Sequence, residues 1–131
     1  MSSNEVYVRF SIENFTKTHD YITNYLEIQP SKIWFEGDLK TNKGTIKYKN
    51  NGWELMLKRK NVYHIDDCLN EIIAILSPKK NSLKALNNIV KKITIIVYSK
   101  NCMPSFVFNN KIISFLNDAC IELEQDIYCL S

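Results

Sequence analysis

The chain has 131 residues, of which 45% are hydrophobic and 11% are aromatic, so we expect one folded domain over residues 1–131. Three Gly and three Pro exclude collagen-like, linker-like and glycine-rich repeat chains. The formal net charge of +3 is too small to indicate a nucleic-acid-binding protein by itself. No apolar run is long enough to form a transmembrane helix.

Charged residues are segregated along the chain. Residues 40–60 and 79–111 are basic, with seven Lys or Arg each, whereas residues 1–39, 61–78 and 112–131 are net acidic. Such blocks can form surfaces of opposite potential that steer a partner. The alternative interpretation is that the lysines solvate separate faces.

The first half of the chain alternates in the manner of strands. Residues 6–12 alternate apolar with polar side chains, and Thr18 can cap a short helix that ends before Pro30. A short strand follows at residues 33–35 and a loop at 38–44. Residues 45–49 and 53–58 flank Asn50-Asn51-Gly52, which predicts a β-hairpin.

The second half mixes helices with strands. Asp66-Asp67 opens a helix that ends at Ser77-Pro78, and Ser82 can cap a second helix up to residue 90. Residues 93–98 are almost entirely apolar and β-branched, which predicts a strand covered on both faces. Asn109 can cap a helix over 110–122, and residues 126–130 alternate as a terminal strand.

The element order is therefore β-α-β-ββ-α-α-β-α-β. This order predicts an α+β single domain with a largely antiparallel sheet and helices packed on one face.

No motif indicates catalysis, a cofactor or a metal site. Phosphate-binding loops and nucleophile elbows are absent, and the four Cys are too widely spaced for a zinc site. An enzyme that uses Cys68, with His64 four residues earlier, or Cys102 stays as a third hypothesis, although a packed Cys explains the pattern better. Acidic groups such as Asp66-Asp67 are explained as helix-start residues. We expect no enzymatic activity.

Nucleic-acid binding is the alternative function. Lys58-Arg59-Lys60 precedes Tyr63, and Lys47-Tyr48-Lys49 places an aromatic ring between two lysines. Basic and aromatic groups together can hold phosphates and stack bases. A regulatory protein would use the basic blocks 40–60 and 79–111, whereas solvated edge-strand lysines are the simpler interpretation.

Protein binding is the leading function. Trp and Tyr are favoured at the centres of protein interfaces, and Trp34 lies beside Glu36 and Asp38. Core packing is the other interpretation of both Trp residues. The candidate partner-contacting residues are Trp34, Glu36, Asp38, Trp53, Glu122 and Glu124.

The N-terminus and the cysteines bear on localisation. Residues 1–5 lack the basic stretch and apolar run of a secretory signal. Three of the four cysteines stand where the apolar pattern calls for a small hydrophobic residue, which suits a reducing compartment. We expect a cytoplasmic protein without a membrane partner.

The motifs also resemble a known family. They are Tyr7-Val8-Arg9-Phe10-Ser11-Ile12, Leu26-Glu27-Ile28-Gln29-Pro30, Trp34-Phe35-Glu36-Gly37-Asp38, Asn51-Gly52-Trp53-Glu54-Leu55, Ile95-Ile96-Val97-Tyr98, Met103-Pro104 and Asp126-Ile127-Tyr128. Together they are similar to the bacterial domain-of-unknown-function family numbered 4279, although Glu27 stands where that family has Gly.

The resemblance implies a small bacterial α+β domain without known catalytic residues. Relatives of this size occur among the immunity proteins of bacterial toxin systems. We therefore expect an immunity protein that neutralises a cognate toxin by direct binding, as in toxin–antitoxin or contact-dependent growth inhibition systems.

Overall fold

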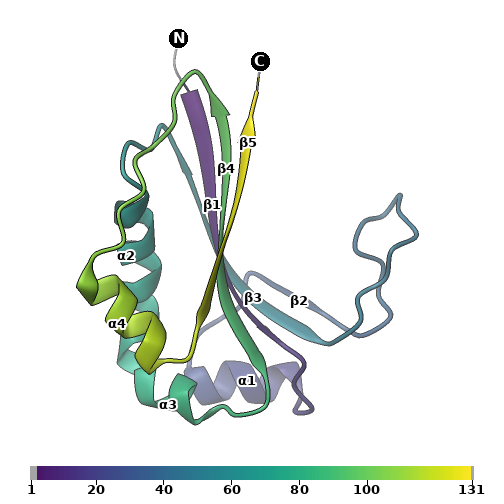
Figure 1. Cartoon of the computed structure of the whole chain (residues 1–131). Coiled ribbons are helices and arrows are strands. Elements are labelled where there is room, and N and C mark those ends of the chain that lie inside the picture. The colour runs from purple at the N-terminus through teal and green to yellow at the C-terminus, as the bar shows by residue number, and fades with distance from the viewer. Residues whose placement is uncertain (1–2, 131) are drawn as a thin grey trace.

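The computed structural model describes residues 3–130, in which five strands form one sheet and the helices lie on one side of it (Figure 1). The strands are β1 (Ser3–Glu13), β2 (Lys32–Trp34), β3 (Gly52–Lys60), β4 (Val90–Lys100) and β5 (Glu122–Cys129). The helices are α1 (His19–Leu26), α2 (Ile65–Leu76), the 3-10 helix η1 (Ser77–Lys79), α3 (Lys80–Ala85) and α4 (Asn110–Asp118). The predicted single-domain α+β class is confirmed.

The first strand of the chain is the centre of the sheet. The strand order is β2-β3-β1-β4-β5, and β1 pairs antiparallel with both β3 and β4. β2 also pairs antiparallel with β3, whereas β4 and β5 are parallel. The sheet is therefore largely antiparallel, as predicted.

The alternation of β1 separates the core from the opposite face. Val6, Val8, Phe10 and Ile12 are at most 1% exposed, because every second side chain of a strand points to the same side. On that side the sheet packs against fully buried residues of the helices, including Leu69, Ile72 and Leu76 of α2, Leu26 of α1 and Leu83 of α3.

Two of the four predicted helix caps are confirmed, and those at Asp66-Asp67 and Ser82 are wrong. Ser82 lies inside α3, which begins at Lys80. The Thr18 hydroxyl accepts a hydrogen bond from the backbone N–H of Tyr21 at 3.0 Å, and the Asn109 side chain accepts one from Ile112 at 3.0 Å. In α2 the capping position is His64, which makes no side-chain cap bond, and Asp66 and Asp67 lie in the first turn. Their carboxylates act there on the positive end of the helix dipole.

The predicted hairpin of residues 45–49 with 53–58 is wrong. Residues 45–49 form no strand, and β3 instead pairs with β2 and β1. Lys47 makes only an isolated bridge to Leu39, and Ile46 is 69% exposed. Because residues 45–49 have no buried face to cover, their alternation does not place them in the sheet.

Three other boundaries also differ from prediction. The helix expected up to residue 90 ends at Ala85, and the helix expected up to residue 122 ends at Asp118, so the terminal strand begins earlier, at Glu122. The prediction that β4 is covered on both faces is wrong, because Tyr98 is 37% exposed. All the helices pack on the side of the sheet opposite Tyr98 (Figure 1). Between residues 3 and 130, no helix has the length and hydropathy needed to cross a membrane.

Candidate functional site: the open face of the sheet

The helices leave one side of the sheet uncovered (Figure 1), and we term it the open face. By strand alternation and register, it carries mainly charged, polar and aromatic side chains. The residues on this face include Lys32 and Trp34 of β2, Glu54, Met56 and Lys58 of β3, Glu5, Tyr7, Arg9, Ser11 and Glu13 of β1, Val90, Lys92, Thr94, Ile96 and Tyr98 of β4, and Glu122, Glu124, Asp126 and Tyr128 of β5.

A charged pair occupies the middle of the open face. Glu54 is only 6% exposed, and its Oε1 lies 3.7 Å from Nη1 of Arg9. Burial raises the pKa of the Glu54 carboxyl, and the positive charges of Arg9 and Lys32 oppose this only in part. The Nε–H of Arg9 is buried and has no hydrogen-bond partner within residues 3–130. The Arg9 side chain as a whole is 37% exposed, so the guanidinium, rather than this shielded N–H, is what an acceptor from outside the chain can reach.

The raised pKa of Glu54 predicts a pH dependence of stability. Above pH 4.5, the ordinary glutamate value, the unfolded chain ionises while the folded chain still holds the proton. Stability due to this group therefore falls as the pH rises, until the folded-state pKa is passed. We expect Glu54→Gln to remove this fall, so the variant gains stability relative to the parent chain across that window. Urea unfolding from about pH 4 to 7 measures it, and parallel curves for the two proteins would contradict it.

An aromatic wall borders the pair on the β2 side. The indole of Trp34 lies against the backbone of Gly52, where an added Cβ would sit 1.8 Å from its Cε2 atom. The Tyr48 ring stacks on Trp34 with centroids 4.6 Å apart. Lys32 Nζ lies 5.8 Å from the Trp34 ring centroid and 5.6 Å from that of Tyr48, within the range of cation–π attraction. Trp34 is 6% exposed, and its Nε1–H has no hydrogen-bond partner in the described chain.

The charged pair and the aromatic wall line one cavity of about 240 Å³. On its far side, Lys92 Nζ lies 3.3 Å from Glu13 and 3.7 Å from Glu124. The cavity thus combines basic groups, acidic groups and aromatic rings. These groups suit recognition of a polar, mixed-charge surface by ion pairs and hydrogen bonds.

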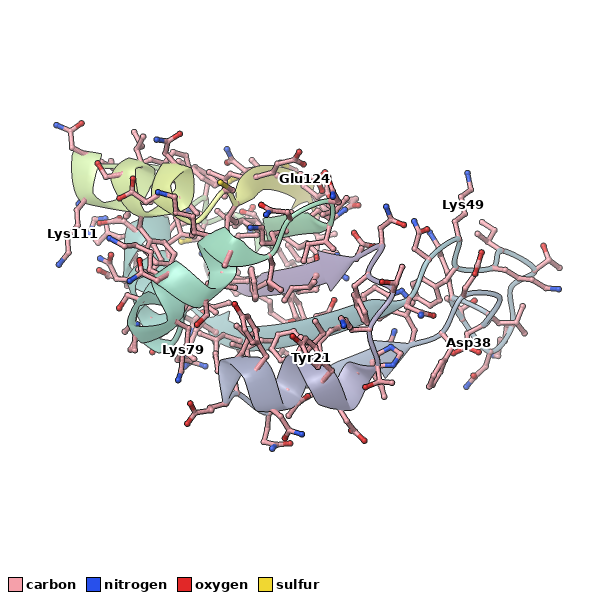
Figure 2. The ribbon with its side chains drawn as sticks, turned by 90° about the horizontal axis from the view of Figure 1, so that it is seen from below. Tyr21, Asp38, Lys49, Lys79, Lys111 and Glu124 are labelled. Carbon is pink, nitrogen blue, oxygen red and sulfur yellow. The ribbon has the colours of Figure 1, made fainter. Side chains whose placement is uncertain are left out.

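Residues 35–51 form a projection that we term the arm (Figures 1 and 2). It folds back on itself, because Lys40 N–H donates to the Ile46 carbonyl at 2.9 Å and Tyr48 N–H donates to that of Asp38 at 2.8 Å. Phe35, Leu39 and Ile46 are 54%, 49% and 69% exposed. The arm therefore presents apolar side chains beside the charged open face.

The structure divides the predicted contact residues among three places. Trp34 and Glu124 line the cavity, and Glu122 lies on the same strand as Glu124, opposite Lys92. Glu36 and Asp38 are exposed on the arm, where the Asp38 carboxylate accepts a hydrogen bond from the Phe35 N–H.

The prediction that Trp53 contacts a partner is wrong. It is fully buried on the helix side of the sheet, and its Nε1–H donates to the Thr23 hydroxyl at 3.0 Å. Core packing therefore explains Trp53, which offers no surface to a partner.

Sequence reasoning missed Arg9, Glu54 and Lys92, and it considered Tyr48 only for nucleic-acid binding. Arg9 and Glu54 each occupy a polar position between apolar neighbours in an alternating strand, a pattern that is also typical of solvated positions. Their proximity depends on the pairing of β1 with β3, which joins residues 39 to 55 positions apart.

Comparison with protein families assigns the chain to a family. The family described as Domain of unknown function (DUF4279) matches residues 4–130, almost the whole chain. The chain belongs to this family. No significant match was found among curated proteins or among solved structures.

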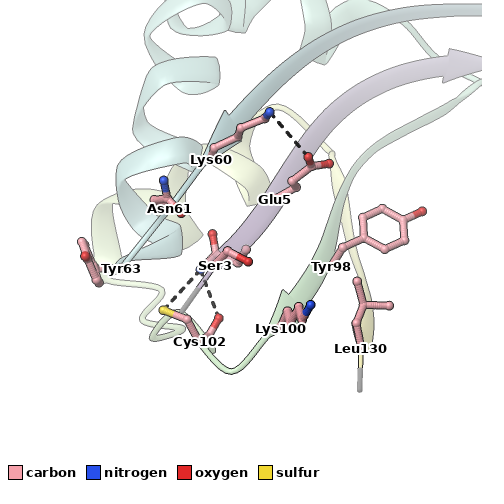
Figure 3. Close-up of a pocket in the computed structure, with 10 residues that line it drawn as sticks. Ser3, Glu5, Lys60, Asn61, Tyr63, Tyr98, Lys100, Cys102 and Leu130 are labelled. Atoms are coloured by element: carbon pink, nitrogen blue, oxygen red, sulfur yellow. Dashed lines mark hydrogen bonds and ion pairs between the residues drawn. The ribbon is translucent and has the colours of Figure 1, made fainter. Parts of the chain in front are cut away.

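A second cavity, of about 790 Å³, lies at the other end of the sheet of this DUF4279 chain (Figure 3). Glu5 lies there between Lys58 and Lys60, at 3.9 and 3.8 Å. The Asn4 amide donates to the carbonyls of Val62 and Cys102 at 2.8 and 3.1 Å, so it fastens the strand ends together. These contacts give Asn4 and Glu5 structural roles at this end of the sheet.

The cysteines of the DUF4279 chain show no catalytic arrangement. Cys68 is 3% exposed, and burial raises the pKa of its thiol, which disfavours the reactive thiolate. His64 instead contacts Ser105 through Nδ1 at 2.8 Å. The Asn4 amide donates to the Cys102 sulfur at 3.8 Å, and an amide is no general base. Within residues 3–130, no three His, Cys, Asp or Glu side chains are grouped to hold a metal ion.

The two basic blocks of the DUF4279 chain do not form one patch. Lys49 lies on the arm, whereas Lys79 and Lys111 lie at the opposite end of the molecule (Figure 2). Several basic residues of the blocks are also paired with acidic residues elsewhere in the fold: Lys58 and Lys60 with Glu5, Arg59 with Glu71, Lys79 with Glu27, Lys80 with Asp118, and Lys92 with Glu13 and Glu124.

Proposed function

We propose that this chain is a non-enzymatic protein-binding module, an immunity protein that neutralises a cognate bacterial toxin by direct binding in the cytoplasm. The observation that carries the proposal is the open face. Five strands present charged and aromatic side chains there, and the helices cover only the opposite side. A sheet face of this kind needs only a complementary surface to act by occlusion.

A protein partner would cover only a modest share of the molecular surface. A specific interface commonly covers about 800 Å² on each protein, roughly a tenth of the 8140 Å² of accessible surface here. The arm adds the exposed side chains of Phe35, Leu39 and Ile46 next to the cavity. Apolar anchors beside partly buried charges are the usual composition of an interface centre and its rim.

The charge of the open face indicates what the toxin presents. Lys58 lies on β3, whereas Glu124 and Asp126 lie on β5, with Arg9 on the central strand. A partner surface must therefore carry both signs of charge. This differs from a uniformly acidic inhibitor, which would suit a basic nuclease site.

The test is co-expression with the product of the adjacent upstream gene. We expect that product to be toxic alone and harmless when the present chain is co-expressed. With both proteins purified, we expect the Arg9→Met variant to bind the toxin about tenfold or more weakly than the parent chain does. Lys111→Met is the matched control, because it removes the same charge from the far end of the molecule (Figure 2). A neighbouring product that is harmless, or whose toxicity is unaffected, would overturn the proposal.

The second candidate is a nucleic-acid-associated regulatory protein. It is favoured by Lys40, Lys43, Lys47 and Lys49 of the arm, for which no ion pair is found in the described chain, and by the Tyr48 ring among them. This candidate requires binding that weakens steeply with salt. If single- or double-stranded DNA or RNA shows no mobility shift with the protein at about 50 mM salt, this candidate function is excluded.

A further inference from the structure

The outer edge of β5 is an unpaired strand edge. β5 is the last strand of the sheet and pairs only with β4 among the strands of the described chain (Figure 1). Along its eight residues, every side chain except that of Leu123 is exposed. Such an edge presents free backbone N–H and C=O groups that can accept another strand.

The side chains along this edge carry one sign of charge. Glu122, Glu124 and Asp126 occupy alternate positions on the open face, opposite Lys92, Thr94 and Ile96 of β4. Glu124 has one long ion pair, at 3.7 Å to Lys92, and is 51% exposed. β5 itself contains no Lys or Arg, so the negative potential of the row is only partly offset.

This charge pattern selects against a second copy of the same edge. Two β5 strands that continue the sheet around a two-fold axis would place residues of the same face opposite each other. Glu124 would then face Asp126 or another Glu124, and like charges directly opposite are destabilising. A strand with Lys or Arg at every second position would make favourable cross-strand pairs instead.

We propose that the outer edge of β5 docks an extended strand of a partner protein that carries Lys or Arg at alternate positions. This inference rests on the proposed function and names the mode of recognition. Tyr98 and Tyr128 extend the row, with stacked rings 5.1 Å apart and 37% and 49% exposed. The incoming strand has an apolar residue next to its basic positions, and that residue packs over this pair of rings.

The probe is a capped eight-residue peptide that alternates Lys with Val or Thr, and a second peptide with Glu in place of Lys is its control. Both are titrated into the full-length protein, with affinity read from fluorescence anisotropy and contacts read from backbone amide exchange. We expect the Lys peptide to bind and to protect the amides of residues 122–129, and the Glu peptide to do neither. No protection in β5, or equal binding of the two peptides, would overturn the inference.

The chain supplies a closely matched control variant. Asp118, like Glu124, is 51% exposed and has one ion pair of 3.7 Å to a lysine, but it lies on α4. We expect Glu124→Lys to weaken binding of the Lys peptide by about tenfold or more, with Asp118→Lys leaving it unchanged. Equal losses in the two variants would show general attraction rather than docking on β5.

Three further outcomes distinguish a partner strand from a second copy of the chain, and the edge inference from the proposed function. Concentration-dependent self-association of the parent chain, with protection of residues 122–129, would replace the partner strand by a second copy. If the toxin is neutralised equally well by Glu124→Lys and by the parent chain, the edge inference fails while the proposed function stands. If no toxin is found, the proposed function fails, and the peptide experiment still decides whether the edge accepts a basic strand.

Discussion

Replacing Trp53 by alanine is expected to lower the free energy of unfolding by about 3–5 kcal/mol. Trp53 has no exposed surface, its ring meets that of Phe10 edge to face with centroids 6.2 Å apart, and its Nε1–H donates to Thr23. The substitution leaves a large cavity beneath the centre of the sheet, which the rigid strands cannot close. Equilibrium unfolding in urea, followed by circular dichroism, measures the loss.

Thr23→Val is the matched control for this prediction. It removes only the hydroxyl that accepts the indole N–H at 3.0 Å, so we expect a loss of about 1 kcal/mol. A loss below about 1 kcal/mol for Trp53→Ala would place this side chain outside the core. The stability measurement thus tests the core assignment directly, without a partner protein.

Gly52→Ala is expected to cost about 1–3 kcal/mol and to displace the wall of the cavity. The added Cβ would sit 1.8 and 1.9 Å from two carbons of the Trp34 indole, far inside van der Waals contact. A rigid ring stacked on Tyr48 cannot move aside without shifting the base of the arm. The measurements are urea unfolding and the chemical shift of the Trp34 indole N–H.

Two variants separate the clash at Gly52 from a general effect of losing a glycine. At Gly44 an added Cβ would meet chiefly the hydroxyl of Thr41, which can rotate away, so Gly44→Ala should be nearly neutral. Combining Gly52→Ala with Trp34→Ala should cost less than the sum of the two single changes, because the clash is then absent. Additive losses would mean that the contact between Gly52 and Trp34 does not set the stability.

The fold class followed from features that act over a few residues. Alternation predicted β1, and side-chain caps at Thr18 and Asn109 predicted the starts of α1 and α4. The hairpin prediction failed because Asn50-Asn51-Gly52 resembles a tight turn, whereas residue 52 already belongs to β3 and pairs with Trp34 of β2. The residues of a turn do not determine which distant strand will pair with the strand that follows the turn.

The candidate site was less predictable than the fold. Trp34 and Glu124 were selected for their residue types, and they reach one cavity only because β1 and β4 lie between β3 and β5. Arg9 and Glu54 looked like ordinary solvated positions of half-buried strands. Glu54 is 6% exposed and the Arg9 side chain 37%, and the two meet through strands that pair across long sequence separations, which no local pattern contains.

The central position of β1 has a consequence for synthesis on the ribosome. β1 ends at Glu13, but its partners β3 and β4 begin only at Gly52 and Val90. Val6, Val8, Phe10 and Ile12 must therefore leave the exit tunnel with both strand edges unsatisfied, and wait for most of the polypeptide to be translated. We expect nascent chains truncated before β4 to need chaperone protection and to aggregate without it.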